Sequence, residues 1–354
     1  MLQFALPDRL SLAHKLAAQK MLIARQMTNA IFARHPELEQ RYGTLGRVKS
    51  DDDGCFHIDF LAGSLVAGSV QAFEDYIHWT TGVLAARGLG ADAVQESLLL
   101  MEGTARELLL PEEFSVVQTY MSAGRKACLL PPSGDAAESK SANIWQDLML
   151  AFRTAVLSGQ RQAALYVVDE AQNLGADLLD IYEDIIAESL HSIGFLWAGN
   201  QANVAQEHMA SSVVQYVIAI LYTRIQRPAS SRGNMVVTGV RGEQHQIGLS
   251  LVADAMESQG WNVRFLGSNL PHSTILEQVR DFAQVVCIST TLIANLPATA
   301  ELISLLCSNL SNKTPKIILG GAAIRLAPEF VQEYGPVLAV HNLREAIKLL
   351  EGSN

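Results

Sequence analysis

Apolar residues recur at steps of three and four over most of the first two thirds of the chain, which is the period of an amphipathic helix. In the first 128 residues this pattern predicts helices over 12–35, 56–88 and 93–109. The stretch 41–54, RYGTLGRVKSDDDG, separates the first two, and its glycines and charges predict a loop. We therefore expect residues 1–128 to form an N-terminal helical domain.

The helical period returns between residues 143 and 227, where it predicts four helices separated by short turns that contain glycine. These helices cover residues 144–159, 161–175, 178–199 and 203–225. Four helices of this length with short connections are typical of a four-helix bundle. The stretch 129–142 before the bundle combines Pro-Pro with Ser, Gly and Lys and has no period, so it predicts a linker.

From residue 234 to residue 354 the pattern changes to short β-branched runs that alternate with amphipathic helical stretches. The runs cover residues 235–240, 262–267, 283–290, 315–321 and 336–340. This alternation predicts a doubly wound, Rossmann-like α/β domain with a parallel sheet. The expected fold class of the whole chain is thus α plus α/β. In the α/β domain we expect a ligand at the carboxyl ends of the strands.

The composition of the chain argues against several classes of binding partner and site. The 354 residues are 49% hydrophobic and 18% charged, as in a globular protein, and the formal net charge is −10. No dense basic cluster is present, so direct nucleic-acid binding has little electrostatic support. Neither a signal peptide nor a run of eighteen apolar residues occurs, and the four cysteines show no CxxC spacing. We expect a cytoplasmic protein without a membrane span, a disulfide or a zinc site.

The loop after the first predicted strand carries a carboxylate and an imidazole. It reads TGVRGEQHQIGLS, residues 238–250, and places Glu243 two positions before His245. Its glycines do not have the GxGxxG spacing of a dinucleotide site. A carboxylate held against one nitrogen of an imidazole fixes the tautomer and raises the basicity of the other nitrogen. The pair predicts a metal ligand at His245, and Gly248 would let the next helix begin close to the bound group.

Hydroxyl groups and glycines follow two later strands, at Ser289 and Thr291 and at Gly320 and Gly321. Taken singly, such residues usually belong to ordinary turns. Together with the histidine loop, their spacing resembles the signature of the cobalamin-binding domains of methionine synthase, mutases and corrinoid proteins. Forty residues separate Gly248 from Ser289, and 28 separate Thr291 from Gly320.

This resemblance implies that His245 is the lower ligand of the cobalt ion and displaces the dimethylbenzimidazole base of cobalamin. It also implies that the base and its nucleotide tail pass between the strands, beside the four residues Ser289, Thr291, Gly320 and Gly321. One position departs from the family pattern, because Glu243 stands where the signature usually has Asp. The longer side chain is expected to reach the imidazole and to alter the strength of the bond between His245 and cobalt.

In the predicted bundle, nine residues separate Trp197 from the pair Glu207 and His208. By itself this spacing fits a core tryptophan and a surface pair. Beside the cobalamin signature, it resembles the cap of the light-sensing cobalamin transcription regulators. That resemblance implies that Trp197 and Glu207 contact the adenosyl group of adenosylcobalamin. It implies that His208 becomes the upper ligand of cobalt after light has broken the cobalt–carbon bond.

The N-terminal domain differs from the helix-turn-helix of those regulators, since it contains no basic recognition helix, and we expect no direct DNA binding. It could bind a protein partner, drive oligomerisation or hold a second ligand. Cations beside aromatic surface suit the propionates of a tetrapyrrole. The segment also resembles the photocobilins, which hold biliverdin, while the plainer interpretation is a packing helix with a solvated loop. The candidate bilin-binding residues are Arg41, Tyr42, Arg47, Lys49 and His57.

Three functions are consistent with these patterns. The leading hypothesis is a non-enzymatic light sensor that holds adenosylcobalamin and changes its homo-oligomeric state or its protein partner on illumination. An alternative is a corrinoid methyl carrier of a methyltransferase system, and another is an anti-repressor that binds a transcription factor. A methyl carrier needs an open upper face on the cofactor, so Trp197 and the Glu207–His208 pair favour the sensor.

Overall fold

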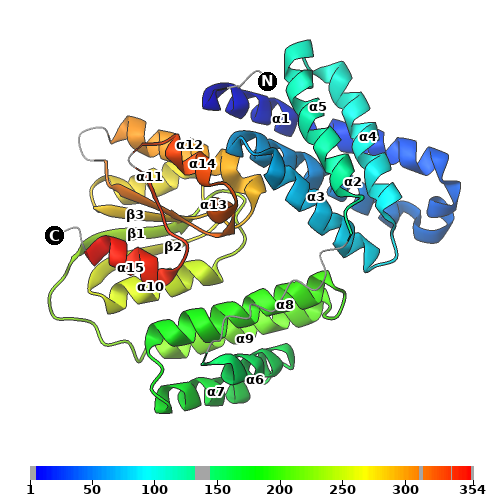
Figure 1. Ribbon diagram of the computed structural model, residues 1–354. Coiled ribbons are helices and arrows are strands. Elements are labelled where there is room, and N and C mark those ends of the chain that lie inside the picture. The colour runs from blue at the N-terminus through cyan, green and yellow to red at the C-terminus, as the bar shows by residue number, and fades with distance from the viewer. Residues whose placement is uncertain (1–4, 132–143, 311–313, 336, 352–354) are drawn as a thin grey trace. The chain divides into compact units, whose positions relative to one another are not determined.

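The computed structural model describes residues 5–131, 144–310, 314–335 and 337–351 (Figure 1). Contacts divide the chain into two compact units. Unit 1 contains residues 1–133 together with 292–300 and 326–334, and unit 2 contains the remainder. Most of the linker predicted at 129–142 lies outside the described residues. Among the helices that are described, none has both the length and the apolar character needed to span a bilayer.

Five long helices make up most of unit 1, and we call them the N-terminal bundle. They are α1 (Leu6–Arg34), α2 (Pro36–Ala67), α3 (Val70–Ala85), α4 (Ala91–Leu108) and α5 (Pro111–Ala127). Their buried faces form one apolar core that includes Leu16, Ile58, Phe73, Leu98 and Met121. The unit also contains two short elements from later in the chain, the 3₁₀ turn η2 (Ile293–Asn295) and the helix α14 (Pro328–Gln332).

The loop predicted at 41–54 is wrong, because this stretch belongs to α2. Only Gly43 leaves the helical conformation, with φ 56° and ψ −154°. Gly54 marks a close approach of two helices, since an added Cβ atom would lie 2.9 Å from the Cβ atom of Ala24 in α1. The glycines that suggested a turn therefore serve helix packing and a single kink.

The helix predicted over 56–88 is divided in two. Gly68 has a left-handed φ of 68° and ends α2, and the hydroxyl of Ser69 then accepts the backbone N–H of Ala72 at the start of α3. These are the usual end and start signals of helices. The sequence pattern also missed α5, which begins at Pro111 with the side chain of Glu113 accepting the backbone N–H of Leu110.

The first part of unit 2 is the helical cap that the sequence predicts. It consists of α6 (Gln146–Leu157), α7 (Arg161–Asn173), the π-helix η1 (Asp180–Ala187), α8 (Glu188–Ala198) and α9 (Val204–Tyr222). Helix α9 begins with a capping box, because Asn203 Oδ1 accepts the backbone N–H of Gln206 and the side chain of Gln206 accepts that of Asn203. The third predicted helix is thus π-helical in its first half, and π-helices are rare in proteins.

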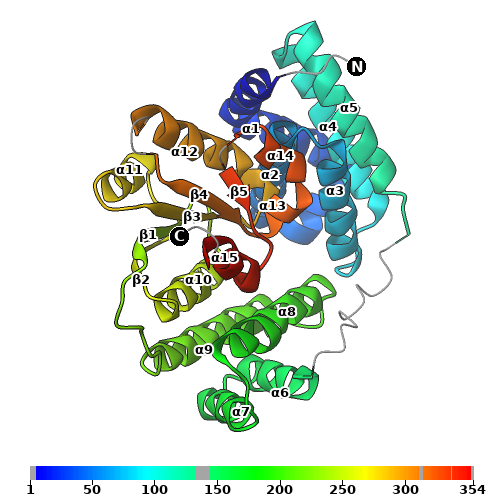
Figure 2. The same ribbon diagram turned by 60° about the vertical axis from the view of Figure 1, so that its left-hand side comes forward.

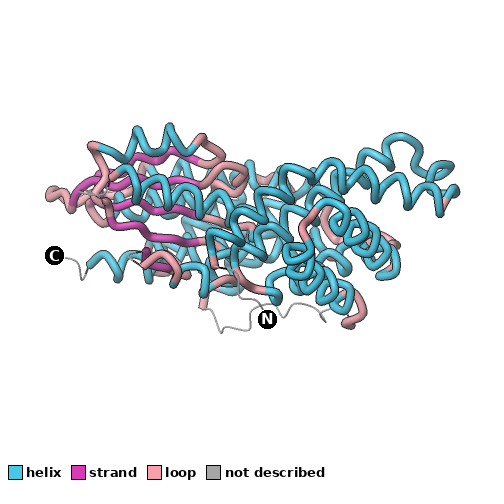
Figure 3. The backbone as a smooth tube through the Cα atoms, turned by 90° about the horizontal axis from the view of Figure 1, so that it is seen from above, coloured by secondary structure: helices cyan, strands magenta, loops and turns pink. Residues whose placement is uncertain are grey.

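The second part of unit 2 is a five-stranded parallel sheet with the order β2-β1-β3-β4-β5 (Figure 3). The strands are β1 (Gly233–Gly239), β2 (Trp261–Gly267), β3 (Val285–Ser289), β4 (Lys316–Gly320) and β5 (Val337–Ala339). The predicted α plus α/β fold class is confirmed. Because β2 and β3 lie on opposite sides of β1, the switch point of the sheet falls between β1 and β3, where doubly wound sheets bind ligands.

Helices cover both faces of the sheet. Figures 1 and 2 show α10 and α15 on the face toward the cap, and α11 and α12 on the opposite face. The bounds of the remaining helices are α10 (Ile247–Ser258), α11 (His272–Arg280), α12 (Leu296–Asn309), α13 (Ala322–Leu326) and α15 (Leu343–Glu351). The short α13 follows β4 directly.

The cap and the α/β domain share one hydrophobic core within unit 2. It runs from cap residues such as Phe152 and Val214 to Met235 and Val237 of β1 and Ala255 of α10. Polar contacts from η1 add to it. The hydroxyl of Tyr182 donates to Asp254 in α10, and the guanidinium of Arg344 in α15 pairs with three carboxylates of η1. The cap is therefore held against the α10 and α15 face of the sheet.

Candidate functional site

Glu243 and His245 lie in the turn between β1 and α10. Oε1 of Glu243 lies 2.6 Å from Nδ1 of His245 and also accepts the backbone N–H of His245 at 2.9 Å. Oε2 of the same carboxylate accepts the backbone N–H of Thr291 at 2.8 Å. Thr291 follows β3, so the fully buried carboxylate joins the ends of β1 and β3 across the switch point. This arrangement fixes the orientation of the imidazole.

The electrostatics of the pair define which ring nitrogen carries the proton. Burial raises the pKa of Glu243, but hydrogen bonds from His245 and from the Thr291 backbone outweigh it and hold that pKa below its usual value. An ionised carboxylate only accepts hydrogen bonds, so Nδ1 of His245 carries the proton and donates it. In the neutral ring Nε2 then keeps its lone pair. The side chain of His245 is 53% exposed and can therefore reach a ligand.

The hydrogen bond that His245 donates to Glu243 also makes His245 a stronger base. It raises the pKa of His245 against the opposing effect of partial burial, and the negative charges of Glu243 and of Glu207 in α9 raise it further. A carboxylate behind a metal-binding histidine is the usual way in which proteins orient the ring and increase its donor strength. This geometry suits the predicted role of His245 as a metal ligand.

The predicted strand-end residues lie together at the carboxyl ends of the parallel strands. Ser289 at the end of β3 is in register with Gly320 at the end of β4. Gly321 has a φ of 102°, and a Cβ atom there would lie 2.3 Å from the carbonyl oxygen of Thr290, so the chain leaves bare backbone at this point. At Gly248, no atom lies within 4 Å of an added Cβ position, so the start of α10 is open on that side.

The three predicted cap residues come from α8 and α9. Trp197 is half-buried near the end of α8, and the other two lie in the first turns of α9. Glu207 Oε2 lies 3.4 Å from Nδ1 of His208, and Oε1 of Glu207 accepts the hydroxyl of Ser211 at 3.0 Å. The side chain of His208 is 75% exposed. The negative charge of Glu207 at the start of α9 raises the pKa of His245 in the loop after β1, so the two segments interact electrostatically.

The side chains at this site suit a metal ion that is already coordinated by a macrocyclic cofactor. Within the described ranges, no three His, Cys, Asp or Glu side chains gather as they do in a metal centre built by protein alone. A single exposed imidazole supplies one axial bond, which is what a metal already held by a macrocycle takes from a protein. Hydroxyls and bare backbone at the neighbouring strand ends leave room for a chain-like polar group beside it.

The candidate bilin residues of the N-terminal bundle each have a partner within that bundle. Arg41 lies over the ring of Tyr42, and Arg47 pairs with Glu39 and lies over Phe32. Lys49 Nζ is 3.9 Å from a carboxylate oxygen of Asp52. His57 is buried, its Nδ1 lies 2.9 Å from the hydroxyl of Tyr76, and burial lowers the pKa of His57 to about 4. A bilin site here stays a prediction from sequence.

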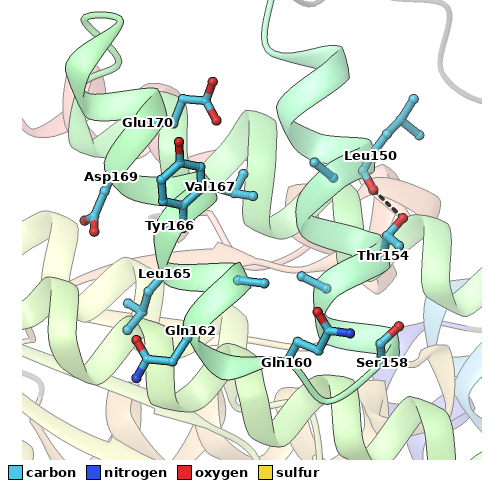
Figure 4. A pocket seen from close by; sticks show the side chains of 13 residues that line it. Leu150, Thr154, Ser158, Gln160, Gln162, Leu165, Tyr166, Val167, Asp169 and Glu170 are labelled. Carbon is cyan, nitrogen blue, oxygen red and sulfur yellow. Dashed lines mark hydrogen bonds between the residues drawn. The ribbon is translucent and has the colours of Figure 1, made fainter.

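A groove of about 1040 Å³ lies between α6 and α7 in the cap (Figure 4). Its lining residues include Thr154 of α6, Ser158 directly after α6, and Tyr166 and Glu170 of α7. Sequence reasoning did not point to it, because these are ordinary helix-surface residues in an amphipathic pattern. None of the predicted cobalamin ligands lines this groove, so it is separate from the site around His245.

Sequence reasoning also missed the residues that connect the cap to the α/β domain. The charge of Asp254 in the otherwise apolar run LSLVADAM is a signal that could have been used, since a charge on the buried face of a helix needs a partner. Its partner, Tyr182, is 72 residues away in the chain and could not be identified from the pattern.

Comparison with known proteins finds matches in the helical cap and in the α/β domain. Residues 233–347 match a family model described as a B12 binding domain, and residues 150–222 match a second model with the same description. The dimethylamine corrinoid protein 1 of Methanosarcina acetivorans is 24% identical over 205 residues, which cover 57% of this chain and 95% of that protein. Methionine synthase of Mycobacterium tuberculosis is 28% identical over 173 residues, which cover 48% of this chain and 14% of that protein.

One solved structure agrees in fold. The monomethylamine corrinoid protein of Methanosarcina barkeri has a TM-score of 0.52 and 18% identity, and the match covers 59% of this chain and 99% of that chain. At this identity the likeness concerns the fold alone.

Proposed function

We propose that this chain binds a corrinoid and carries a methyl group for a methyltransferase system, on the premise that its helical cap and its α/β domain both match B12 binding domain models. The observation that carries corrinoid binding is the contact of 2.6 Å between Glu243 and His245 at the switch point of the sheet. Similarity to the dimethylamine corrinoid protein 1 of Methanosarcina acetivorans supports the carrier role over light sensing.

In this proposal the residues bind and orient the cofactor, and separate methyltransferases perform the reaction. The bound corrinoid supplies a cobalt ion that takes up and gives up a methyl group. His245 would hold the cobalt ion through Nε2, and Glu243 would hold the Nδ1 proton and the ring orientation. The strand-end residues would bind the nucleotide tail, and the cap would exclude water from the bound cofactor. The strand-end residues are Ser289, Thr291, Gly320 and Gly321.

The corrinoid part of the proposal is tested by identifying the nitrogen that binds cobalt. Uniformly ¹⁵N-labelled protein is loaded with hydroxocobalamin, reduced to the cobalt(II) state and examined by electron paramagnetic resonance. A protein imidazole splits each cobalt line into a ¹⁵N doublet, whereas the cofactor's own unlabelled base gives a ¹⁴N triplet. We expect the doublet in the wild type and in His191→Ala, which changes an exposed cap histidine, and its loss in His245→Ala. A triplet in the wild type rejects the assignment.

The carrier role is tested with methylcobalamin as the probe. Protein loaded with methylcobalamin is mixed with a thiol acceptor and a purified corrinoid-dependent thiol methyltransferase, and demethylation is followed by visible absorption. We expect faster demethylation of the protein-bound cofactor than of free methylcobalamin at the same concentration. Equal or slower demethylation of the bound form, with binding itself intact, argues against a carrier.

Light sensing is the second candidate function, and it is based on two residues of the cap. Glu207 acts electrostatically on His245, and the neighbouring His208 is exposed and therefore free to bind a metal. The test is absorption and size-exclusion chromatography of adenosylcobalamin-loaded protein in the dark and after green light, for the wild type and His208→Ala. A sensor gives a lit spectrum that depends on His208 and a change of mass, and a carrier gives neither. A red-absorbing band after addition of biliverdin would reveal a second chromophore.

A further inference from the structure

The N-terminal bundle lies outside residues 150–222 and 233–347, which match the two B12 binding domain models, and one of its helices packs closely against a segment that follows β3. In unit 1, Gly63 in the last turns of α2 lies against the backbone of η2. A Cβ atom at Gly63 would be 2.0 Å from the carbonyl oxygen of Ile293 and 2.9 Å from Cα of Ala294. Since backbone meets backbone here, only glycine fits.

The contact is buried on both sides. Gly63 and Ser64 of α2 are buried, and Ile293 is 4% exposed. The turn η2 is closed by the backbone N–H of Asn295, which donates to the carbonyl of Leu292 at 2.9 Å. A second tie within unit 1 joins the guanidinium of Arg9 to the carboxylate of Glu333 beyond α14. Within unit 1, the N-terminal bundle therefore contacts these later segments at two places, η2 and the residue that follows α14.

Two residues before Ile293, the chain belongs to the candidate cofactor site. The backbone N–H of Thr291 donates to Oε2 of Glu243, whose Oε1 holds Nδ1 of His245. Thr290, one residue earlier, is pinned to β4, because its N–H donates to the carbonyl of Gly320 and its carbonyl accepts the N–H of Ala323. Thr291 therefore lies between η2 and the last residue that is hydrogen-bonded to β4.

We propose that the N-terminal bundle controls the bond between His245 and the cofactor through this short path, from Gly63 to Ile293, along the chain to Thr291, and through Glu243 to the imidazole. The inference rests on the proposed corrinoid binding. It assigns the N-terminal bundle a regulatory role: whatever moves the end of α2 changes the carboxylate that orients the metal ligand. By linkage the effect is reciprocal, so loading the cofactor must stabilise the end of α2.

The first test needs no substitution. Amide hydrogen exchange is measured on the full chain with and without hydroxocobalamin. We expect slower exchange after loading in the peptide over 58–67 of α2, as well as in the β1 loop over 241–247, because exchange reports local opening. Slower exchange in the loop with no change over 58–67 overturns the coupling and leaves corrinoid binding standing. No uptake of hydroxocobalamin at all overturns the proposed function instead.

The second test disturbs the contact and compares a matched variant. Gly63→Ala inserts a methyl group against the Ile293 carbonyl, and Gly103→Ala places the same methyl group in open space on α4 of the same bundle. We expect Gly63→Ala to change the dissociation constant for hydroxocobalamin about fivefold or more and to shift its visible spectrum, and Gly103→Ala to do neither. A folded Gly63→Ala protein with wild-type affinity and spectrum overturns the inference; if that variant does not fold, the exchange experiment decides.

Discussion

The hydroxyl of Tyr182 in the cap donates a hydrogen bond of 2.9 Å to Oδ2 of Asp254 in α10, and both side chains are buried. Burial is the main reason that the pKa of Asp254 rises to about 6 from its ordinary value of 3.8, and the bond from Tyr182 only partly opposes it. One of the contacts between the cap and the α/β domain therefore involves a carboxyl group whose pKa is raised to about 6.

The raised pKa of Asp254 predicts a specific pH dependence of stability. Between pH 3.8 and pH 6 the folded protein binds this proton more tightly than the unfolded chain does. The stabilisation is complete below the lower pKa and is lost as pH rises through the higher one. Asp254→Asn keeps an oxygen that accepts from Tyr182 and has no charge to bury, so it should be more stable than the wild type at pH 8 by about 1–2 kcal/mol. Urea unfolding at several pH values measures the difference, and parallel stability curves for the two proteins would contradict it.

Burial of His57 predicts the opposite slope for the N-terminal bundle. Its pKa is lowered to about 4, below the unfolded value of 6.5, so the unfolded chain binds the proton more tightly between these values. Stability is complete above pH 6.5 and is lost as pH falls toward 4, by about 2–3 kcal/mol for this group. His57→Gln should flatten that loss in thermal melts recorded from pH 7 to pH 4. His191→Gln, at an exposed histidine, serves as the control and should melt like the wild type at each pH.

Substitutions of Glu243 can distinguish the effect of its charge on His245 from the effect of its side-chain length. Glu243→Gln removes the negative charge and keeps an acceptor for one N–H, and it should weaken hydroxocobalamin binding about tenfold or more. Glu243→Asp keeps the charge but shortens the side chain that now reaches both His245 and Thr291. We expect the aspartate variant to bind more tightly than the glutamine variant and less tightly than the wild type. Spectroscopic titrations give the three constants, and equal binding by all three would show that this carboxylate does not support the ligand.

The ion pairs between η1 and α15 should set how firmly the cap is held. Arg344 pairs with Asp180 at 2.7 Å and Asp184 at 3.2 Å, and it also pairs with Glu183, whose carboxylate accepts the backbone N–H of Leu343 at the start of α15. Because the side chain is partly exposed, removing it should cost only about 1 kcal/mol, as for a small surface network.

The matched variant for Arg344→Ala is Arg224→Ala, which removes a similarly exposed ion pair with Asp169 inside the cap. We expect Arg344→Ala to speed amide exchange in both η1 and α15, and Arg224→Ala to leave α15 unchanged. The same exchange in α15 for both variants would mean that these pairs do not hold the cap.

Much of the fold could be predicted from local pattern. The central strands β1, β3 and β4 are mostly buried and leave short continuous apolar runs, which makes them visible in the sequence. The edge strands β2 and β5 are more exposed, and their short β-branched runs still predict them. The helical boundaries of the N-terminal bundle were less visible. Gly43 and Gly54 look like loop residues, but packing of α2 on α1 keeps nearly the whole stretch helical, and local propensity yields to such tertiary contacts.

The sequence by itself determined the candidate ligand, because Glu243 and His245 stand two residues apart in one turn and their contact is local. It also determined the parallel sheet whose strand ends collect Ser289 and Gly320. Only the tertiary structure decided which partners complete the site. Thr291 is 48 residues from Glu243, Asp254 is 72 from Tyr182, and Ile293 meets Gly63 from a distant part of the chain. Nothing in a local pattern of side chains specifies such pairs, since they exist only once the core has brought the segments together.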